Sequence, residues 1–369
     1  MRKFVYQYPA WPDLTWDAAA LAGMLGEVRR KQGRFIGRLE AVGFSLRNRT
    51  MLDATTSEIT DSFAIEGEDI DVASVRSSIA RRLGLDLEGV DTSTASGHFV
   101  EGVVEMMIDA SRGCRLPLTE DRLFGWHTAL FPDGRSGLSK IAVGKYRTEE
   151  MRIVSGSIGK ESIHYIAPEP AAVHEEMASF LAWVNGDGNG VVDGVIKAGI
   201  AHFRFIMIHP FDDGNGRLAR AITEMLLARA DNSGDRYYSL SSRMLKERKD
   251  YYAALEKGQY SEGDVTEWLS WYIGCLGRAV DDSADSIEGA LAKADFWDKH
   301  KDVSFNARQQ RMVNMLIDGF EGKVTTAKWG KITKCSHDTA LRDIKDMIEK
   351  GVLTQSAAGG RSASYLLAR

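Results

Sequence analysis

Apolar residues recur three or four positions apart along most of the chain, which is the spacing of an amphipathic helix. In residues 16–49, Leu21, Leu25 and Val28 alternate with arginines and lysines, which predicts one helix or a pair with a break near Gly33. Further helices are expected over residues 54–66, 71–83, 95–111, 119–130, 171–185, 193–208, 215–231, 243–257 and 264–291. The expected fold class is therefore mainly α.

Residues 145–168 depart from the helical pattern. Alternating apolar positions, among them Ile153 and Tyr165, flank the run Ser155-Gly156-Ser157-Ile158-Gly159. Alternation on both sides of small, turn-forming residues is typical of a β-hairpin. We therefore expect one hairpin within the helical fold.

A separate unit is expected after about residue 300. Three short helices are predicted there, over Gln309–Ile317, Thr326–Lys334 and Asp338–Lys350, and Ser336 caps the third. Two apolar runs follow, Val352–Thr354 and Ser364–Leu367, joined by the Gly-rich segment 357–361. Three helices and a Gly-rich β-wing are the outline of a winged helix-turn-helix.

These patterns divide the chain into four parts. They are an N-terminal helical region at 1–94, a central domain at 95–285, a connector at 286–305 and a winged-helix domain at 306–369. A length of 369 residues is enough for two or three domains.

Composition places the chain among soluble globular proteins, with 44% hydrophobic and 27% charged residues. No run approaches the roughly 18 apolar residues that a membrane span needs, and the first residues lack the apolar core of a signal peptide. The three cysteines are far apart and outside any metal-binding spacing, which suits a reducing compartment. We expect a cytoplasmic protein.

Charge is distributed unevenly around the net value of −5. Residues 306–369 hold 11 lysines and arginines against 6 aspartates and glutamates, whereas residues 1–305 hold 36 against 46. A basic tail raises the question of nucleic acid. The third predicted helix of the tail mixes Lys, His and Arg with three aspartates, which is a poor face for phosphates. DNA binding through residues 306–369 therefore stays open.

The most informative segment is the run from His209 to Arg220, HPFDDGNGRLAR, between two apolar helical patterns. Pro210 ends the first helix, so the loop delivers Gly214, Asn215 and Gly216 to the start of the next. A helix N-terminus preceded by glycines binds anions through its free N–H groups.

Charged side chains in the same run complete a nucleotide site. Arg217 and Arg220 lie one turn apart and can reach one polyphosphate. Asp213 is placed to hold Mg²⁺ that bridges phosphates. His209 is the only strong base in the run and suits the removal of a hydroxyl proton near pH 7.

The run resembles the signature His-x-Phe-x-(Asp/Glu)-Gly-Asn-Gly-Arg-x-x-Arg of Fic-domain proteins, with no motif position departing from it. Most of that family transfers AMP from ATP to a protein hydroxyl. The resemblance implies a Fic helical core in the central domain, with ATP and Mg²⁺ as its substrate and metal. It assigns the general base to His209 and the metal ligand to Asp213.

The same resemblance distributes the phosphate contacts. Gly214, Asn215 and Gly216 match the family's anion hole, and Arg217 and Arg220 match its β- and γ-phosphate contacts. Phe211 matches the aromatic residue that anchors the loop in the core.

Two neighbouring features fit the resemblance. The hairpin, with Ile153, Val154, Ser155 and Gly156 in its first strand and turn, resembles the flap that binds target backbone by strand addition. Its simpler interpretation is a plain surface hairpin. About thirty residues after the motif, Tyr251 and Tyr252 resemble the tyrosines on the adenine side of Fic pockets, although tyrosines at this spacing also fit a core.

An inhibitory element is expected near the N-terminus. The segment Ser62-Phe63-Ala64-Ile65-Glu66-Gly67 matches the family's inhibitory pattern (Ser/Thr)-x-x-x-Glu-(Gly/Asn). The resemblance pairs Glu66 with Arg220, where Glu66 blocks the productive γ-phosphate pose. Ser62 and Gly67 belong to the same element, and the simpler interpretation is a solvated Glu at a helix end. The opening YQYPAWPDLTWD also resembles segments that precede some bacterial Fic domains.

The sequence thus predicts an autoinhibited protein adenylyltransferase acting on Ser, Thr or Tyr hydroxyls of a target and of itself. Two alternatives remain. One is removal of AMP, with Glu66 positioning a water. The other is a DNA-binding regulator whose Fic unit senses nucleotide. The sequence does not decide whether the chain forms a homodimer.

Overall fold

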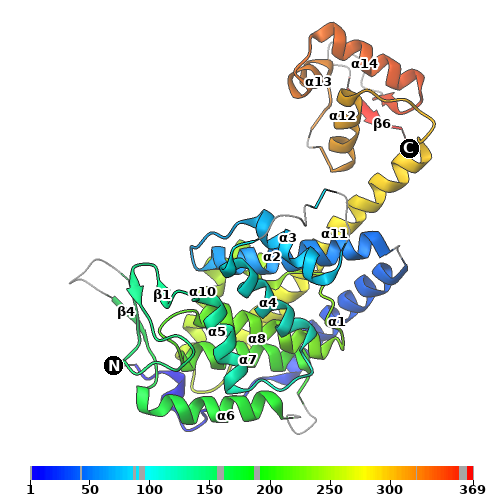
Figure 1. Ribbon diagram of the computed structural model, residues 1–369. Helices are drawn as coiled ribbons and strands as arrows, with labels where there is room; N and C mark the ends of the chain where they lie inside the picture. Colours follow the sequence, from blue (N-terminus) through cyan, green and yellow to red (C-terminus); the bar gives the residue numbers. More distant parts are fainter. Residues whose placement is uncertain are drawn as a thin grey trace. The chain divides into compact units, whose positions relative to one another are not determined.

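The computed structural model describes residues 2–41, 44–85, 89–90, 96–155, 162–186, 192–320, 322–356 and 364–368. The chain divides into two compact units, Met1–Ser283 and Ala284–Arg369. The first contains η1 (Val5–Gln7), α1 (Ala18–Ala41), α2 (Phe44–Ile65), α3 (Val72–Leu83), α4 (His98–Arg112), α5 (Glu120–Leu130), η2 (Pro170–Ala172), α6 (Val173–Asn185), α7 (Gly194–Ile208), α8 (Asn215–Ala230), α9 (Leu240–Lys246) and α10 (Arg248–Gln259). The mainly helical fold class is confirmed (Figure 1).

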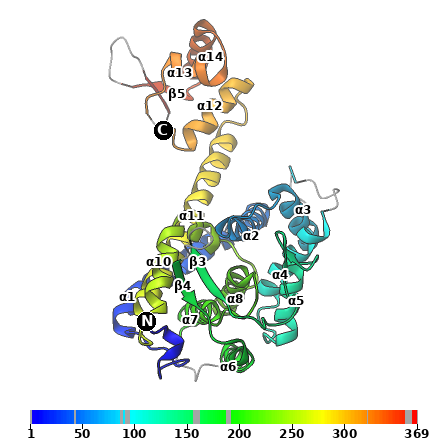
Figure 2. The ribbon, with the colours of Figure 1, turned by 90° about the vertical axis from the view of Figure 1, so that its left-hand side faces the viewer.

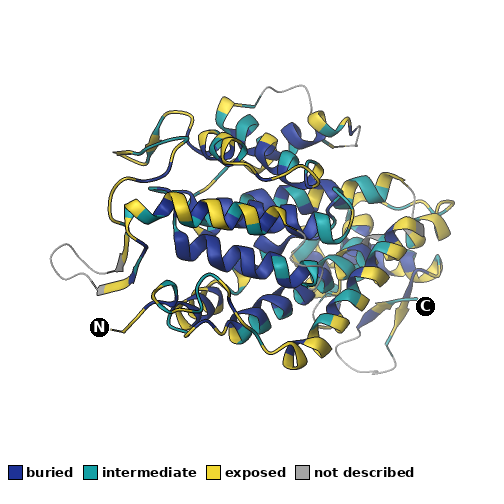
Figure 3. Ribbon diagram, turned by 90° about the horizontal axis from the view of Figure 1, so that it is seen from below, coloured by how far each residue is buried: buried dark blue, intermediate teal, exposed yellow. Residues whose placement is uncertain are grey.

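Helices α7 and α8 pack against each other at the centre of the first unit, as Figures 1 and 2 show. Nearly every residue of both helices is buried, because α6, α4 and α2 pack around them. Figure 3 shows the same arrangement, with buried positions gathered on central helices and exposed positions on the outer ones. A helix covered on all sides is a rigid support for the loop at its end.

Several helices begin where the sequence predicts, at residues whose side chains cap them. Asp71 accepts a hydrogen bond from Ser74 N at the start of α3, and Asp193 accepts one from Val195 N at the start of α7. Thr119 caps α5 in the same way. These caps satisfy N–H groups that the first helical turn leaves unpaired.

Two of the expected helices differ in detail from the structure. Gly33 does not interrupt α1, which continues to Ala41, because buried residues such as Leu21 and Phe35 hold it against the unit. One glycine costs a helix only about 1 kcal/mol. The helix expected over 243–257 is divided, since α9 ends at Lys246 and α10 starts at Arg248.

The hairpin expected within 145–168 is confirmed. Strand β3 (Arg152–Ser155) pairs antiparallel with β4 (Ser162–Ile166), with Arg152 opposite Ile166. Its turn, which includes Gly156, lies outside the described residues. A second, unpredicted hairpin joins β1 (Arg135–Ser136) to β2 (Ser139–Lys140).

Helix α11 (Thr266–Lys299) begins in the first unit and ends in the second. The segment 286–305, expected as a connector, is thus helical for most of its length, because no proline stops the helix there. None of the helices in the described part of the chain has the length and apolar character needed to cross a membrane.

The second unit follows the predicted order of elements. Helices α12 (Ala307–Ile317), α13 (Thr326–Thr333) and α14 (His337–Glu349) precede the antiparallel strands β5 (Leu353–Gln355) and β6 (Tyr365–Leu367). Ser336 caps α14 through Thr339 N. Trp329, Ile344 and Met347 are fully buried in its core. The Gly-rich segment 357–361 lies outside the described residues.

Candidate active site

The loop between α7 and α8 has the geometry of an anion-binding turn. His209 ends α7 in the left-handed conformation, with φ +49°, and Gly214 precedes α8 with φ +82°. A Cβ at Gly214 would lie 2.8 Å from the Phe131 ring, so this position requires glycine. The loop therefore leads directly into a helix N-terminus, as the sequence predicts.

Phe211 and Asn215 fix the shape of this loop. Phe211 is fully buried, and its ring stacks on His127 at 4.2 Å between centroids. The Asn215 side chain accepts from Phe211 N at 3.0 Å and donates to Phe211 O at 2.8 Å. Because this amide is bonded within the loop, the contribution of Asn215 to an anion site comes from its backbone N–H.

His209 is oriented to act as a base. Its Nδ1 lies 3.2 Å from the backbone oxygen of Ile206, so Nδ1 carries the proton and Nε2 keeps a free lone pair. Burial lowers the pKa of His209 to about 4, so the ring is neutral near pH 7. It lines a cavity of about 700 Å³ together with Glu66, Gly216 and the two tyrosines Tyr251 and Tyr252.

Asp213 has the surroundings of a metal ligand shared with a substrate. Its carboxylate accepts hydrogen bonds from Gly214 N and from the Ser136 hydroxyl, and its side chain is 40% exposed. In the described part of the chain, no cluster of three or more His, Cys, Asp or Glu residues forms a metal cage. One open carboxylate fits Mg²⁺, which often takes most of its remaining ligands from water and substrate phosphates.

Arg217 and Arg220 are both buried at the start of α8, each 2% exposed. Arg217 lies between the rings of Phe63 and Phe131, at 4.9 and 5.0 Å from their centroids. Within the described residues, Arg217 Nε and Nη2 and Arg220 Nη1 lack a hydrogen-bond partner. Buried N–H groups without a hydrogen-bond partner are costly, and an anion in the loop would satisfy these three.

Glu66 occupies the place predicted for it. Its Oε1 lies 2.8 Å from Arg220 Nη2, and a Cβ on Gly216 would lie 2.1 Å from the same oxygen. Ser62 adds two bonds to Arg220, through its hydroxyl to Nε at 2.7 Å and its carbonyl to Nη2 at 2.8 Å. Gly67 leaves α2 with φ +81°, so the helix ends directly at the site.

The hairpin lies beside the cavity. Ile153 from β3 and Tyr165 from β4 line it, and Ile153 and Ile163 are 40% and 49% exposed. In the described residues, β3 and β4 pair only with each other. Val154 and Ser155 complete β3, which leaves a strand edge next to His209.

The two tyrosines differ in their surroundings. Tyr251 is buried, and its hydroxyl lies 2.9 Å from His202 Nε2. Tyr252 is 42% exposed, and the Arg248 guanidinium lies 5.7 Å from its ring centroid. Tyr252 is thus the accessible aromatic of the pair, whereas Tyr251 also belongs to the core.

Sequence reasoning missed three residues that shape the loop. His127 accepts from Gly144 N at 3.1 Å and therefore donates through Nε2 to Asp213 O at 3.2 Å. Ser136 binds the Asp213 carboxylate, and Arg147 binds His209 O at 2.8 Å. Each lies more than sixty positions from its partner, so no local pattern indicates the contact.

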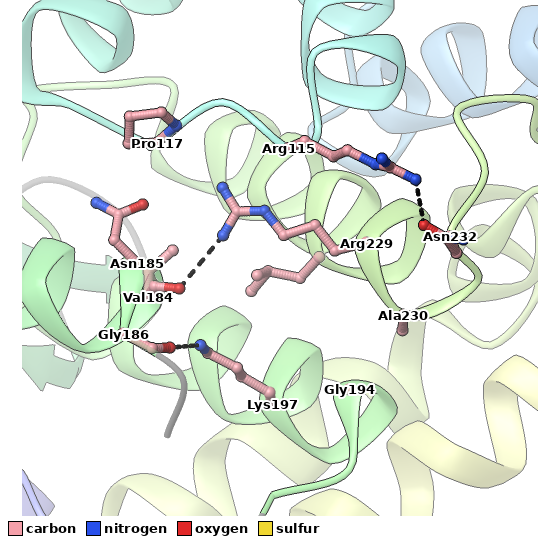
Figure 4. A pocket seen from close by; sticks show the side chains of 11 residues that line it. Arg115, Pro117, Val184, Asn185, Gly186, Gly194, Lys197, Arg229, Ala230 and Asn232 are labelled. Atoms are coloured by element: carbon pink, nitrogen blue, oxygen red, sulfur yellow. Dashed lines mark hydrogen bonds between the residues drawn. The ribbon is translucent and has the colours of Figure 1, made fainter. Parts of the chain in front are cut away.

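A second cavity of about 460 Å³ carries cations that are engaged by the protein itself (Figure 4). Arg229 donates to the carbonyls of Cys114, Leu116 and Val184. Lys197 donates to Gly186 O. These carbonyls follow or end α4 and α6, where cations stabilise the negative helix termini.

Comparisons with known proteins agree with this geometry. Residues 117–227 match the Fic/DOC family, and residues 4–85 match a domain of unknown function (DUF4172). The chain is 26% identical over 235 residues to protein adenylyltransferase Fic of Drosophila melanogaster, a match covering 63% of this chain and 43% of the relative. The corresponding protein of Drosophila virilis is also 26% identical, over 64% of this chain and 44% of the relative.

Solved structures show the same fold. A Fic family protein from Desulfovibrio desulfuricans G20 has a TM-score of 0.53 at 20% identity, over 94% of this chain and 95% of that one. Fic-1 from C. elegans has a TM-score of 0.52 at 20% identity, over 74% of each chain. The chain spans less than half the length of the curated relatives, but the match over 117–227 includes the whole motif. Residues 117–227 of this chain are therefore a Fic domain.

Proposed function

We propose that the protein is an adenylyltransferase that moves AMP from ATP to a Ser, Thr or Tyr hydroxyl of a target protein and of itself. The observation that carries the proposal is the pair of buried arginines with unpartnered N–H groups, one turn apart beside a glycine turn. His209 opens into the adjoining cavity. A polyphosphate and a hydroxyl acceptor fit these two halves of the site.

The proposed reaction begins with ATP phosphates on the N–H groups at Gly214, Asn215 and Gly216. Arg217 and Arg220 orient the β- and γ-phosphates through their free guanidinium N–H groups. Tyr252 provides an aromatic surface for the base, with Tyr251 supporting it from the core. Mg²⁺ on Asp213 would neutralise phosphate charge as pyrophosphate departs.

The acceptor hydroxyl approaches along the hairpin. Exposed Ile153 and the free edge of β3, including Val154 and Ser155, suit an extended target segment added as a strand. His209 Nε2 takes the hydroxyl proton while the oxygen attacks the α-phosphorus. A P–O bond to the acceptor forms as the bond to pyrophosphate breaks, and the proton passes from His209 to solvent.

Glu66 holds this site in an inhibited state. Its carboxylate takes the Arg220 contact that the γ-phosphate needs, and it lies against Gly216, where the phosphates would approach. Because Ser62 also binds Arg220, the end of α2 leaves only Nη1 available. While α2 stays in place, ATP binds in a pose that is unsuited to attack on the α-phosphorus.

The test compares label transfer from α-labelled ATP by wild type, Glu66→Gly and Glu66→Gly with Arg220→Ala. Glu66→Gly should increase self-modification about 5- to 150-fold, the range expected for a coupling of this size. Adding Arg220→Ala should abolish transfer. Label from γ-labelled ATP should not be transferred, which separates AMP transfer from phosphorylation. Equal rates for wild type and Glu66→Gly at saturating ATP and Mg²⁺ would reject the inhibitory role.

Removal of AMP is the alternative on the same site, with Glu66 orienting a water. Incubating AMP-modified protein with wild type and Glu66→Gly separates the two. If wild type releases AMP from the modified protein and Glu66→Gly does not, the result would favour the hydrolase.

One observation also favours a nucleic-acid role for residues 306–369. Two of the three aspartates of α14 are engaged inside the unit, since Asp343 binds Arg308 at 2.7 Å and Asp346 binds Gln309 at 2.7 Å. Arg342 and Lys345 remain exposed. The second unit is accordingly proposed as a winged helix whose third helix contacts DNA. Salt-dependent binding to duplex DNA that Lys345→Ala weakens would support this role.

A further inference from the structure

Arg147 is a buried cation that no carboxylate pairs with in the described part of the chain. It is 2% exposed, and its guanidinium donates only to backbone carbonyls. These are His209 O from Nε at 2.8 Å, Glu149 O from Nη1 at 3.0 Å and Pro168 O from Nη2 at 2.5 Å. Burying a cation without an acidic partner costs free energy, so this arrangement calls for a function.

The three carbonyls belong to two parts of the site. Glu149 precedes β3 and Pro168 follows β4, so they form the two roots of the hairpin. His209 carries the candidate base, and the backbone N of Arg147 also donates to Pro210 O at 2.9 Å. One residue thus joins both roots of the hairpin to the turn at the end of α7.

The conformation of His209 requires such support. Its φ of +49° lies in the left-handed region, which a non-glycine residue adopts only when its surroundings hold it there. The His209 carbonyl points to Arg147 while Nδ1 faces Ile206 O. Together the two contacts fix the peptide and the ring, and hence the direction of Nε2.

We propose that Arg147 is a positioning residue, which holds the base His209 and the roots of the hairpin in one fixed geometry. A target hydroxyl that is bound along β3 then meets Nε2 of His209 in a position that is already fixed. This inference rests on the proposed function. It predicts that Arg147 governs the rate of transfer while leaving nucleotide binding intact, because the guanidinium contacts no group assigned to the phosphates.

Arg229 supplies a matched control. Its guanidinium too donates to three backbone carbonyls, those of Cys114, Leu116 and Val184, and among the described residues it forms no ion pair with a carboxylate. Figure 4 shows it in the second cavity, and no residue of the motif loop lines that cavity. Replacing either arginine by Met removes the same kind of interaction, so a general loss of stability affects both variants.

The experiment uses the full chain carrying Glu66→Gly. Three quantities are measured for Arg147→Met, Arg147→Lys and Arg229→Met. They are kcat for self-modification at saturating Mg²⁺-ATP, Kd for an ATP analogue with a non-cleavable α,β bond, and the melting temperature. Arg147→Met should lower kcat about 10²-fold, the scale of a displaced catalytic group. Its Kd for the ATP analogue should stay within about 3-fold of the parent value.

Arg147→Lys, which keeps the positive charge but has fewer hydrogen-bond donors, should show an intermediate kcat. If Arg147→Met does not fold, Arg147→Lys alone tests the inference. Arg229→Met should have a lower melting temperature than the Glu66→Gly parent but the same kcat. The inference is overturned if Arg147→Met and Arg147→Lys retain the parent kcat. It is also overturned if Arg229→Met loses as much kcat as Arg147→Met, or if Kd worsens in parallel with kcat. No transfer by the Glu66→Gly parent would instead reject the proposed function.

Discussion

Glu68 Oε2 accepts a hydrogen bond from Arg217 Nη1 at 2.6 Å, two residues after the Glu66 contact with Arg220. Both motif arginines are therefore engaged by carboxylates from the segment that follows α2. The two contacts differ in exposure, because the Glu68 side chain is 43% exposed and that of Glu66 is 31% exposed. Glu68 thus adds a second, more exposed contact to the proposed inhibited state.

Removing the second contact should activate the enzyme modestly. Glu68→Gln keeps the size of the side chain but frees Arg217 for the phosphates. In the Glu66→Gly background, we expect transfer from α-labelled ATP at subsaturating ATP to rise about 2- to 5-fold, the scale of a half-exposed ion pair. Glu105→Gln, which alters a surface pair with Arg82, serves as the control. A slower Glu68→Gln enzyme would show that Glu68 supports catalysis.

Loss of the base should stop transfer and spare binding. His209→Ala in the Glu66→Gly background should lower kcat by about 10²-fold or more, because His209 carries the only imidazole in the loop. The variant should melt within a few degrees of its parent and bind nucleotide normally. A residual rate close to that of the parent would assign the proton to another group.

Acid should destabilise the first unit in a defined pH window. Burial lowers the pKa of His202 to about 3 and that of His127 to about 4, whereas both titrate near 6.5 when unfolded. The unfolded chain therefore binds more protons below pH 6.5, and stability falls as the pH drops from there toward 4. Each histidine should cost about 2 kcal/mol at pH 5.

Thermal melts between pH 7.5 and 4.5 test this window. His127→Gln should reduce the pH dependence, since the amide can replace both hydrogen bonds without titrating. A melting temperature that does not change below pH 6.5 would contradict the prediction.

The second unit should be dispensable for the chemistry. A truncated chain of residues 1–299 keeps α11 whole and retains every residue of the candidate site. Self-modification in the Glu66→Gly background should stay within about 2-fold of the full chain, as expected for independently folding domains. Aggregation or loss of transfer in the shortened chain would instead show that the tail supports the Fic core.

Local features explain which predictions succeeded. Asp71, Thr119 and Ser336 cap helices through residues three positions away, so the sequence carries the whole signal. The motif loop is equally local, because twelve consecutive residues contain its turn and charges. The possible break at Gly33 does not occur, because the cost of one glycine is small beside the burial of α1.

The rest of the site depends on distant contacts. His127 reaches Asp213 across 86 positions and Arg147 reaches His209 across 62. In a sequence, His127 is one histidine on a helix, and Arg147 is one arginine before a hairpin. Only the packing of α5 and of the segment before the hairpin against the motif loop reveals their partners. Glu68 lay within a visible acidic stretch, but its pairing depends on where α2 ends.

The absence of a side chain at Gly216 serves two opposing states. In the structure it makes room for the Glu66 oxygen, which an added Cβ would approach to 2.1 Å, and under the proposed function the same space receives phosphate once Glu66 has left. Any larger residue there would displace both the Glu66 carboxylate and the phosphate. Under the proposed function, mutation at this one position therefore cannot produce an uninhibited but active enzyme, and loss of inhibition has to come from Glu66 or from the end of α2.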